Sequence, residues 1–178
     1  MKKFLALLLC LVMAFAFVAC DDKKKEEPDD DKGGSSSENS SVNYYVEYKG
    51  VKISLGADAE SVLKALGSPN SEDPQGMCGG VGEVTKYTYL DFLEINIVDA
   101  KVKKTIDKIR ISSDAIVTPE GIGVGANKED VINAYGKAYS DFTDTKIVYN
   151  SGYKSVIFSL RDGAVVKIEY NLDDDWYK

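Results

Sequence analysis

The pattern of apolar and polar positions contains the same arrangement twice. Residues 53–67 align without gaps with residues 122–136, from an opening Ile to a closing Gly. Asp58 and Asn127 hold the same place, just before an apolar stripe at i, i+4 spacing, and these residue types favour a helix N-cap. The closing Gly supplies the left-handed conformation that ends many helices. Each segment is therefore predicted to form one short helix.

Apolar runs of strand length follow each predicted helix. They cover residues 84–90, 92–98 and about 105–111 after the first helix, residues 146–149, 154–160 and 164–170 after the second, and residues 44–48 before the first. Arg161-Asp162-Gly163 indicates a hairpin turn between the last two runs. The predicted fold class is α+β, with two tandem helix-plus-antiparallel-meander repeats and the short helices packed on one face of antiparallel sheet. The repeats are expected at about residues 43–113 and 114–172.

Alternation along the predicted strands separates an inward from an outward face. The residues predicted to face outward are Tyr45, Glu47, Glu94, Asn96, Lys108, Arg110, Ser155, Ile157, Ser159, Val165, Lys167 and Glu169. Val166 is predicted to face inward. Tyr45, Arg110 and Ile157 are the candidate partner-binding residues, because aromatic, arginine and isolated aliphatic side chains dominate interface energies. A wholly solvated face is the alternative.

The first nineteen residues have the layout of a signal peptide. Lys2 and Lys3 precede an apolar run of sixteen residues, which is shorter than the roughly 20 residues that span a membrane comfortably. Residues 17–20, Phe-Val-Ala-Cys, resemble the lipobox of bacterial lipoproteins. The resemblance implies cleavage before Cys20 and lipidation of Cys20, which would anchor the protein on the extracytoplasmic face of the bacterial cell membrane. An uncleaved anchor and plain secretion are the alternatives.

Residues 20–42 are predicted to form a tether, and residues 43–178 a single domain. The tether is rich in Asp, Lys, Ser and Gly, so it cannot offset its ordering entropy by burial. Once Lys2, Lys3 and the tether's eight acids and four lysines are set aside, residues 43–178 keep a net charge of −5. This acidic domain is expected to be repelled by nucleic acid, so a nucleic-acid partner is not predicted.

The chain of 178 residues contains no histidine, and this restricts its chemistry. Ser-His and Cys-His nucleophile pairs and every His-containing metal site are excluded. Cys78 lies in a glycine-rich stretch, residues 76–82, which we interpret as a mobile insertion carrying an incidental cysteine. No pair of carboxylates stands out among the acids. The sequence therefore predicts no catalytic residue, no cofactor site and no metal site.

The helix opening with Gly-Ala-Asx-x-Glu, closing on Gly and leading into three strands resembles the SmpA/OmlA lipoproteins. Two such units in tandem resemble the beta-lactamase inhibitory protein fold, over residues 50–172. The resemblance implies a binding scaffold without a catalytic centre. We therefore expect a membrane-anchored extracytoplasmic lipoprotein that binds a protein or an envelope component. An inhibitor of a secreted hydrolase is the first alternative, and an envelope enzyme using carboxylates or Cys78 is the second.

Overall fold

The structure, a computed structural model, describes residues 42–78, 80–101 and 103–178. Residues 1–41 fall outside the described residues, and with them the predicted signal peptide, Cys20 and the predicted tether up to residue 41. The strands are β1 Tyr45–Tyr48, β2 Val51–Ser54, β3 Ser71–Cys78, β4 Gly82–Tyr89, β5 Leu93–Asp99, β6 Lys104–Ile111, β7 Asp141–Phe142, β8 Lys146–Ser151, β9 Lys154–Arg161 and β10 Ala164–Leu172. The α-helices are α1 Ala59–Leu66 and α2 Lys128–Tyr135, and the chain ends in the 3-10 helix η1 Asp174–Tyr177.

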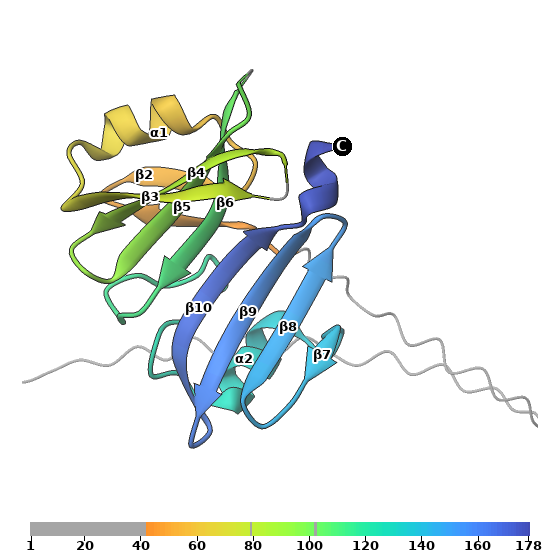
Figure 1. Cartoon of the computed structure of the whole chain (residues 1–178). Coiled ribbons are helices and arrows are strands. Elements are labelled where there is room, and N and C mark those ends of the chain that lie inside the picture. Colours follow the sequence, from red (N-terminus) through yellow and green to blue (C-terminus); the bar gives the residue numbers. More distant parts are fainter. Residues whose placement is uncertain (1–41, 79, 102) are drawn as a thin grey trace, which may run out of the picture. The chain divides into compact units, whose positions relative to one another are not determined.

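The predicted arrangement of two tandem helix-plus-meander repeats is wrong. Strands from both halves of the chain form one eight-stranded antiparallel sheet in the order β3-β4-β5-β6-β10-β9-β8-β7 (Figure 1). Strands β1 and β2 pair only with each other, as a separate two-stranded sheet. The two halves are joined where β6 pairs with β10, through four residue pairs from Lys108–Asn171 to Ile111–Ile168. The pairing of β6 with β10 joins segments that are far apart in the sequence, so the local pattern of apolar and polar residues does not reveal it.

The two predicted helices are present, and their ends explain why. The Asp58 side chain accepts a hydrogen bond from the Ser61 backbone N–H at 3.1 Å, and the Asp130 carboxylate accepts one from the Asn127 N–H at 3.0 Å. Each helix ends at a glycine with positive φ, 77° at Gly67 and 79° at Gly136. These contacts are local, so the sequence pattern identified both helices correctly.

The two helical segments are also held by matching contacts to the large sheet. Tyr89 of β4 donates its hydroxyl hydrogen bond to the Gly67 carbonyl at 3.1 Å. Tyr149 of β8 does the same to the Gly136 carbonyl at 2.8 Å. Because each tyrosine is almost fully buried, its hydroxyl is satisfied by the carbonyl left free at the end of a helix.

The hydrophobic core lies on one face of the large sheet, which we call the inner face. Helices α1 and α2 and the β1–β2 hairpin contribute their buried residues to the same cluster as the inward residues of the sheet. The hairpin supplies Val46 and Ile53, both fully buried. In Figure 1, α2 lies behind β8, β9 and β10, so the opposite side of these strands faces the viewer. The inner face is therefore covered, and function at the sheet has to be sought on the other side.

One sequence interpretation fails in the strands, and a second segment proves to be partly strand. Residues 76–78 of the stretch interpreted as a mobile insertion are the end of β3, an edge strand that pairs with β4 along its length. Pro74 and Gly76 flank a register shift in it, which an edge strand tolerates because one side of its backbone is free. Val165, predicted to face outward, is 1% exposed, and Val166 is half-buried and lies outside the core cluster. A register shift between Val165 and Lys167 causes this change.

Candidate functional site

The candidate site is the face of the large sheet opposite the core, which we call the outer face. The strand register aligns its side chains in two rows. The first row runs from β3 to β7 through Ser71, Thr88, Glu94, Arg110, Glu169, Ile157, Val148 and Asp141. The second row runs from β3 to β8 through Asp73, Lys86, Asn96, Lys108, Asn171, Ser155 and Asn150. Both rows cross the junction between β6 and β10, so the two halves of the chain share one surface.

Arg110 stands at that junction and links three strands. Its Nη1 lies 3.0 Å from Glu94 Oε2 on β5, and its Nε lies 3.1 Å from Glu169 Oε1 on β10. Lys167 Nζ lies 2.7 Å from the other Glu169 oxygen, Oε2. The Arg110 side chain is 40% exposed and that of Glu169 only 12%. The network therefore fixes the middle of the outer face and neutralises its two carboxylates.

The electrostatics of Glu169 follow from these neighbours. Burial opposes ionisation of the Glu169 carboxyl, but Lys167 and Arg110 outweigh this effect and hold its pKa below the ordinary value. Glu169 is thus a charged group at neutral pH with both oxygens occupied. A carboxylate of this kind is unsuited to accept a proton from a substrate.

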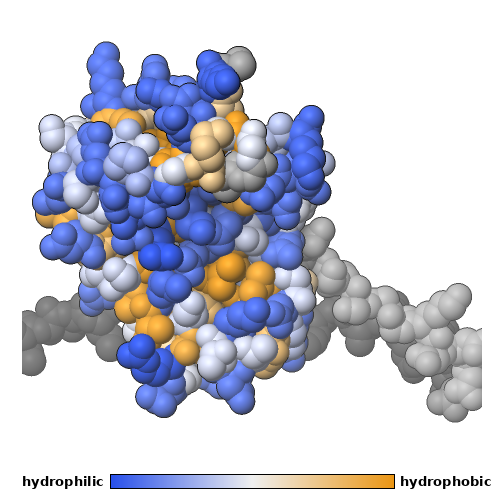
Figure 2. All heavy atoms as spheres, viewed as in Figure 1, coloured by the Kyte–Doolittle hydropathy of each residue, from blue (hydrophilic) through white to orange (hydrophobic). Residues whose placement is uncertain are grey.

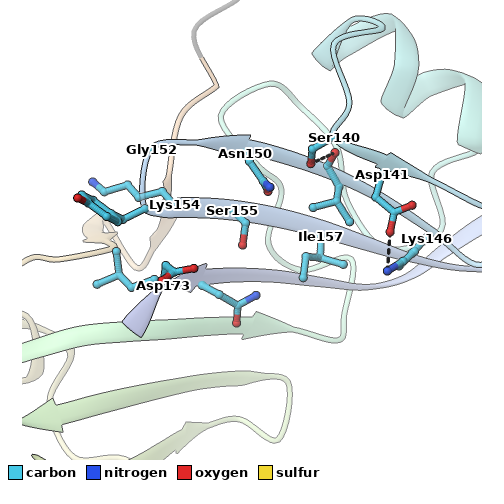
Figure 3. A pocket seen from close by; sticks show the side chains of 13 residues that line it. Ser140, Asp141, Lys146, Asn150, Gly152, Lys154, Ser155, Ile157 and Asp173 are labelled. Atoms are coloured by element: carbon cyan, nitrogen blue, oxygen red, sulfur yellow. Dashed lines mark hydrogen bonds and ion pairs between the residues drawn. The ribbon is translucent and has the colours of Figure 1, made fainter. Parts of the chain in front are cut away.

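A groove of about 480 Å³ lies on the outer face over β8, β9 and β10. Figure 3 shows Asn150, Ser155 and Ile157 along it, with Lys154 toward one end and the Asp141–Lys146 pair at the other. The Lys146 Nζ and Asp141 Oδ2 atoms of that pair are 2.6 Å apart. Val148 and Ile157, which pair across β8 and β9, supply apolar lining. In Figure 2 hydrophobic surface appears on this part of the molecule, surrounded by hydrophilic residues.

The structure brings two of the three candidate partner-binding residues together. Arg110 and Ile157 belong to the first row, and only Glu169 separates them. Tyr45 lies elsewhere, because β1 pairs with β2 and not with the large sheet. Its neighbour Val46 packs into the core, so Tyr45 is on the solvent side of the hairpin, where Lys52 Nζ lies 3.7 Å from its ring centroid. The core thus separates Tyr45 from the outer face.

Sequence reasoning missed several residues of the groove. Asn150 and Asn171 lie beyond the predicted ends of their strands, because β8 continues to Ser151 and β10 to Leu172. Asn171 pairs with Ser155, and Ser155 pairs with Asn150. Extending each predicted strand by one residue would have included both asparagines, on the outward side of the alternation. Tyr153, in the β8–β9 turn, carried no such signal.

Within residues 42–78, 80–101 and 103–178, no group of His, Cys, Asp or Glu is arranged to hold a metal ion. The same part of the chain contains no helix that is long and apolar enough to cross a membrane. The clustered side chains on the outer face offer hydrogen bonds, paired charges and a small apolar surface. This arrangement is suited to binding.

Comparisons with known proteins add little. No family model and no curated protein matches the chain. Among solved structures, the chain is similar to an extracellular protein containing an SCP domain from Bacillus anthracis str. Ames, with 17% sequence identity and a TM-score of 0.43. The match covers 86% of this chain and 50% of the other, so the chain spans about half the length of that protein. A likeness this distant carries no inference about function.

Proposed function

We propose that the protein is a non-catalytic binding module whose outer face engages a partner in the cell envelope. The partner is a protein or an envelope polymer. The observation that carries this proposal is the first row, which brings Arg110 and Ile157 to the same surface beside the groove. Arginine is enriched among the few residues that supply most of the energy of a typical interface, an aliphatic side chain such as Ile157 adds buried apolar area, and rim charges add little.

The surface also has the mixed character of a recognition site. Its charged centre is internally paired, so binding there leaves no isolated charge to be desolvated. Ile157 and Val148 are only half-buried in the described structure and can lose further apolar area to a partner. A surface that is ordered before binding loses less conformational entropy when the complex forms.

We further propose that the module is attached to the extracytoplasmic face of a bacterial membrane through lipid on Cys20. The support is the sequence around Cys20 and its resemblance to the lipoproteins described above. Cys20→Ala is expected to leave the precursor uncleaved at this site and without acyl chains. Mass spectrometry of the protein purified from membranes checks this, and a free, unmodified Cys20 in the native protein would refute it.

The proposed surface can be tested in living cells without knowing the partner. A photo-crosslinking amino acid is placed at Ile157 and, as a control, at Lys64, an exposed residue of α1 that lies away from the outer face. Illumination is expected to produce adducts with a protein or polymer from position 157 but not from position 64. Equal adduct yields at the two positions would contradict the proposal.

A further inference from the structure

The groove on the outer face is lined mostly by polar residues. Ser140, Asn150, Ser155 and Asn171 contribute hydroxyl and amide groups. Four charged residues also line it. Asp141 pairs with Lys146, the Asp173 carboxylate accepts a hydrogen bond at 2.9 Å from the Asp175 N–H, and Lys154 Nζ lies 5.8 Å from the Trp176 ring centroid. The two acids and two lysines carry no net formal charge, so the groove offers hydrogen bonds to an uncharged ligand.

Among the described groove residues, Asn171 is the one with a buried side-chain atom that lacks a hydrogen-bond partner. Its Oδ1 is buried and has no hydrogen-bond partner among the described residues. A buried carbonyl oxygen without a partner costs free energy, and native proteins leave few of them. Because the Asn171 Oδ1 atom has no hydrogen bond in the free protein, rotating the side-chain amide toward a ligand breaks no hydrogen bond at that atom. A ligand N–H donor would satisfy it.

The groove is also lined by apolar and aromatic side chains. Val148 and Ile157 lie on its floor, and Tyr153 lines it with 51% of its surface exposed. Trp176 supports Tyr153 from the side, with the ring centroids 6.2 Å apart in an edge-on arrangement. An exposed aromatic ring is a large, rigid contact surface at low entropic cost.

We propose that this groove binds a glycan chain bearing N-acetyl groups. Such a chain presents flat C–H faces that pack on Tyr153 and the aliphatic floor, and hydroxyl groups that pair with Asn150 and Ser155. Its acetamido N–H is a donor for Asn171 Oδ1. An extended peptide fits less well, because peptides that add to a sheet do so at a strand edge, whereas most of the groove lies over the face of β8, β9 and β10 and only one end reaches the edge at β7. This inference rests on the proposed function and names its ligand class.

The test is calorimetric titration of the full chain, purified in detergent, with chitotetraose, a chain of N-acetylglucosamine. Cellotetraose, which has the same linkage without acetamido groups, is the comparison ligand. We expect saturable binding of chitotetraose and about tenfold weaker binding of cellotetraose, the loss expected for unpaired polar groups. Absence of chitotetraose binding, or equal affinity for the two chains, would overturn the assignment.

Variants locate the site. Tyr153→Ala and Asn171→Ala are each expected to weaken chitotetraose binding by about fivefold or more. The controls are Asn96→Ala, in the same row on β5 but outside the groove, and Tyr45→Ala on the hairpin, and both should bind as the wild type does. Unchanged binding in both groove variants would place the ligand elsewhere. If chitotetraose fails to bind while adducts from position 157 persist, the glycan inference is wrong and the proposed surface stands.

Discussion

Arg110 and Glu169 show how single residues on the outer face depend on one another. Glu169 stays ionised below its ordinary pKa because Lys167 and Arg110 offset the burial of its carboxyl. A carboxyl with a depressed folded-state pKa contributes stability above its ordinary value, and this contribution is lost as the pH falls through the folded-state pKa. The network should therefore loosen in acid.

Arg110→Ala tests this coupling. Removing the guanidinium leaves burial opposed only by Lys167, so the pKa of Glu169 is expected to rise. Carboxyl NMR titration of Glu169 measures it. Lys86→Ala is the control, because Lys86 pairs with Asp73 at 3.4 Å in a different part of the face. If the Glu169 pKa stays where it is in Arg110→Ala, the pairing described here does not govern that carboxyl.

Some site residues could be predicted from the sequence and others could not. Arg110 and Ile157 were found because burial alternates regularly over Lys108–Ile111 of β6 and along the middle of β9. Val165 was placed on the wrong face because one register shift inverts the alternation beyond it. Tyr45 was assigned to the outer face because the sequence of β1 does not indicate that this strand pairs with β2. The groove asparagines were missed because strand ends are set by pairing partners, which a local pattern does not contain.

At the scale of elements, helices were easier to predict than strands. The ends of α1 and α2 are fixed by residues within each segment. Strand β3, in contrast, is not determined by its own residues. Pro74 and Gly76 favour a loop, and the pairing with β4 makes the segment a strand. The pairing of β6 with β10 is also non-local. It joins the two halves of the chain into one eight-stranded sheet.

Gly67→Ala tests the role of the helix-ending glycine. Gly67 has φ 77° and ψ −166°, a conformation essentially restricted to glycine, and no heavy atom beyond its chain neighbours lies within 4 Å of where a Cβ would be. Backbone strain alone should therefore lower the free energy of unfolding by about 1–3 kcal/mol. Urea denaturation measures the change, and Ser68→Ala next to it is expected to stay within about 0.5 kcal/mol of the wild type. Equal stability of the two variants would mean that the conformation at Gly67 is not required.

At the scale of the whole molecule, buried tyrosines make stability depend on alkaline pH. Burial raises the pKa of Tyr149 to about 12, and the nearby Tyr139 adds to the effect. Burial likewise raises the pKa of Tyr44 to about 12, with a contribution from Glu120. Tyrosines in the unfolded chain ionise near about pH 10. The stabilisation is therefore complete below that pH and is lost as the pH rises toward 12.

Tyr149→Phe separates the two roles of this side chain. Losing the hydrogen bond to Gly136 should lower stability near pH 7 by about 1 kcal/mol. The decline of stability between about pH 10 and 12 should become shallower, because one ionising group is gone. Urea unfolding over this pH range measures both effects. Tyr153→Phe, at an exposed tyrosine, should change neither, and an unchanged alkaline slope in Tyr149→Phe would argue against the burial described here.

The proposed function requires that the outer face, and not the hairpin side of the molecule, engages the envelope. The affinity of the full chain, in detergent, for purified envelopes of the cells that make it tests this. Arg110→Ala and Ile157→Ala are each expected to weaken binding by about 1 kcal/mol or more, about fivefold, with the fold intact by thermal unfolding. Tyr45→Ala should bind as the wild type does. Unchanged affinity in both outer-face variants, or a loss confined to Tyr45→Ala, would contradict the claim.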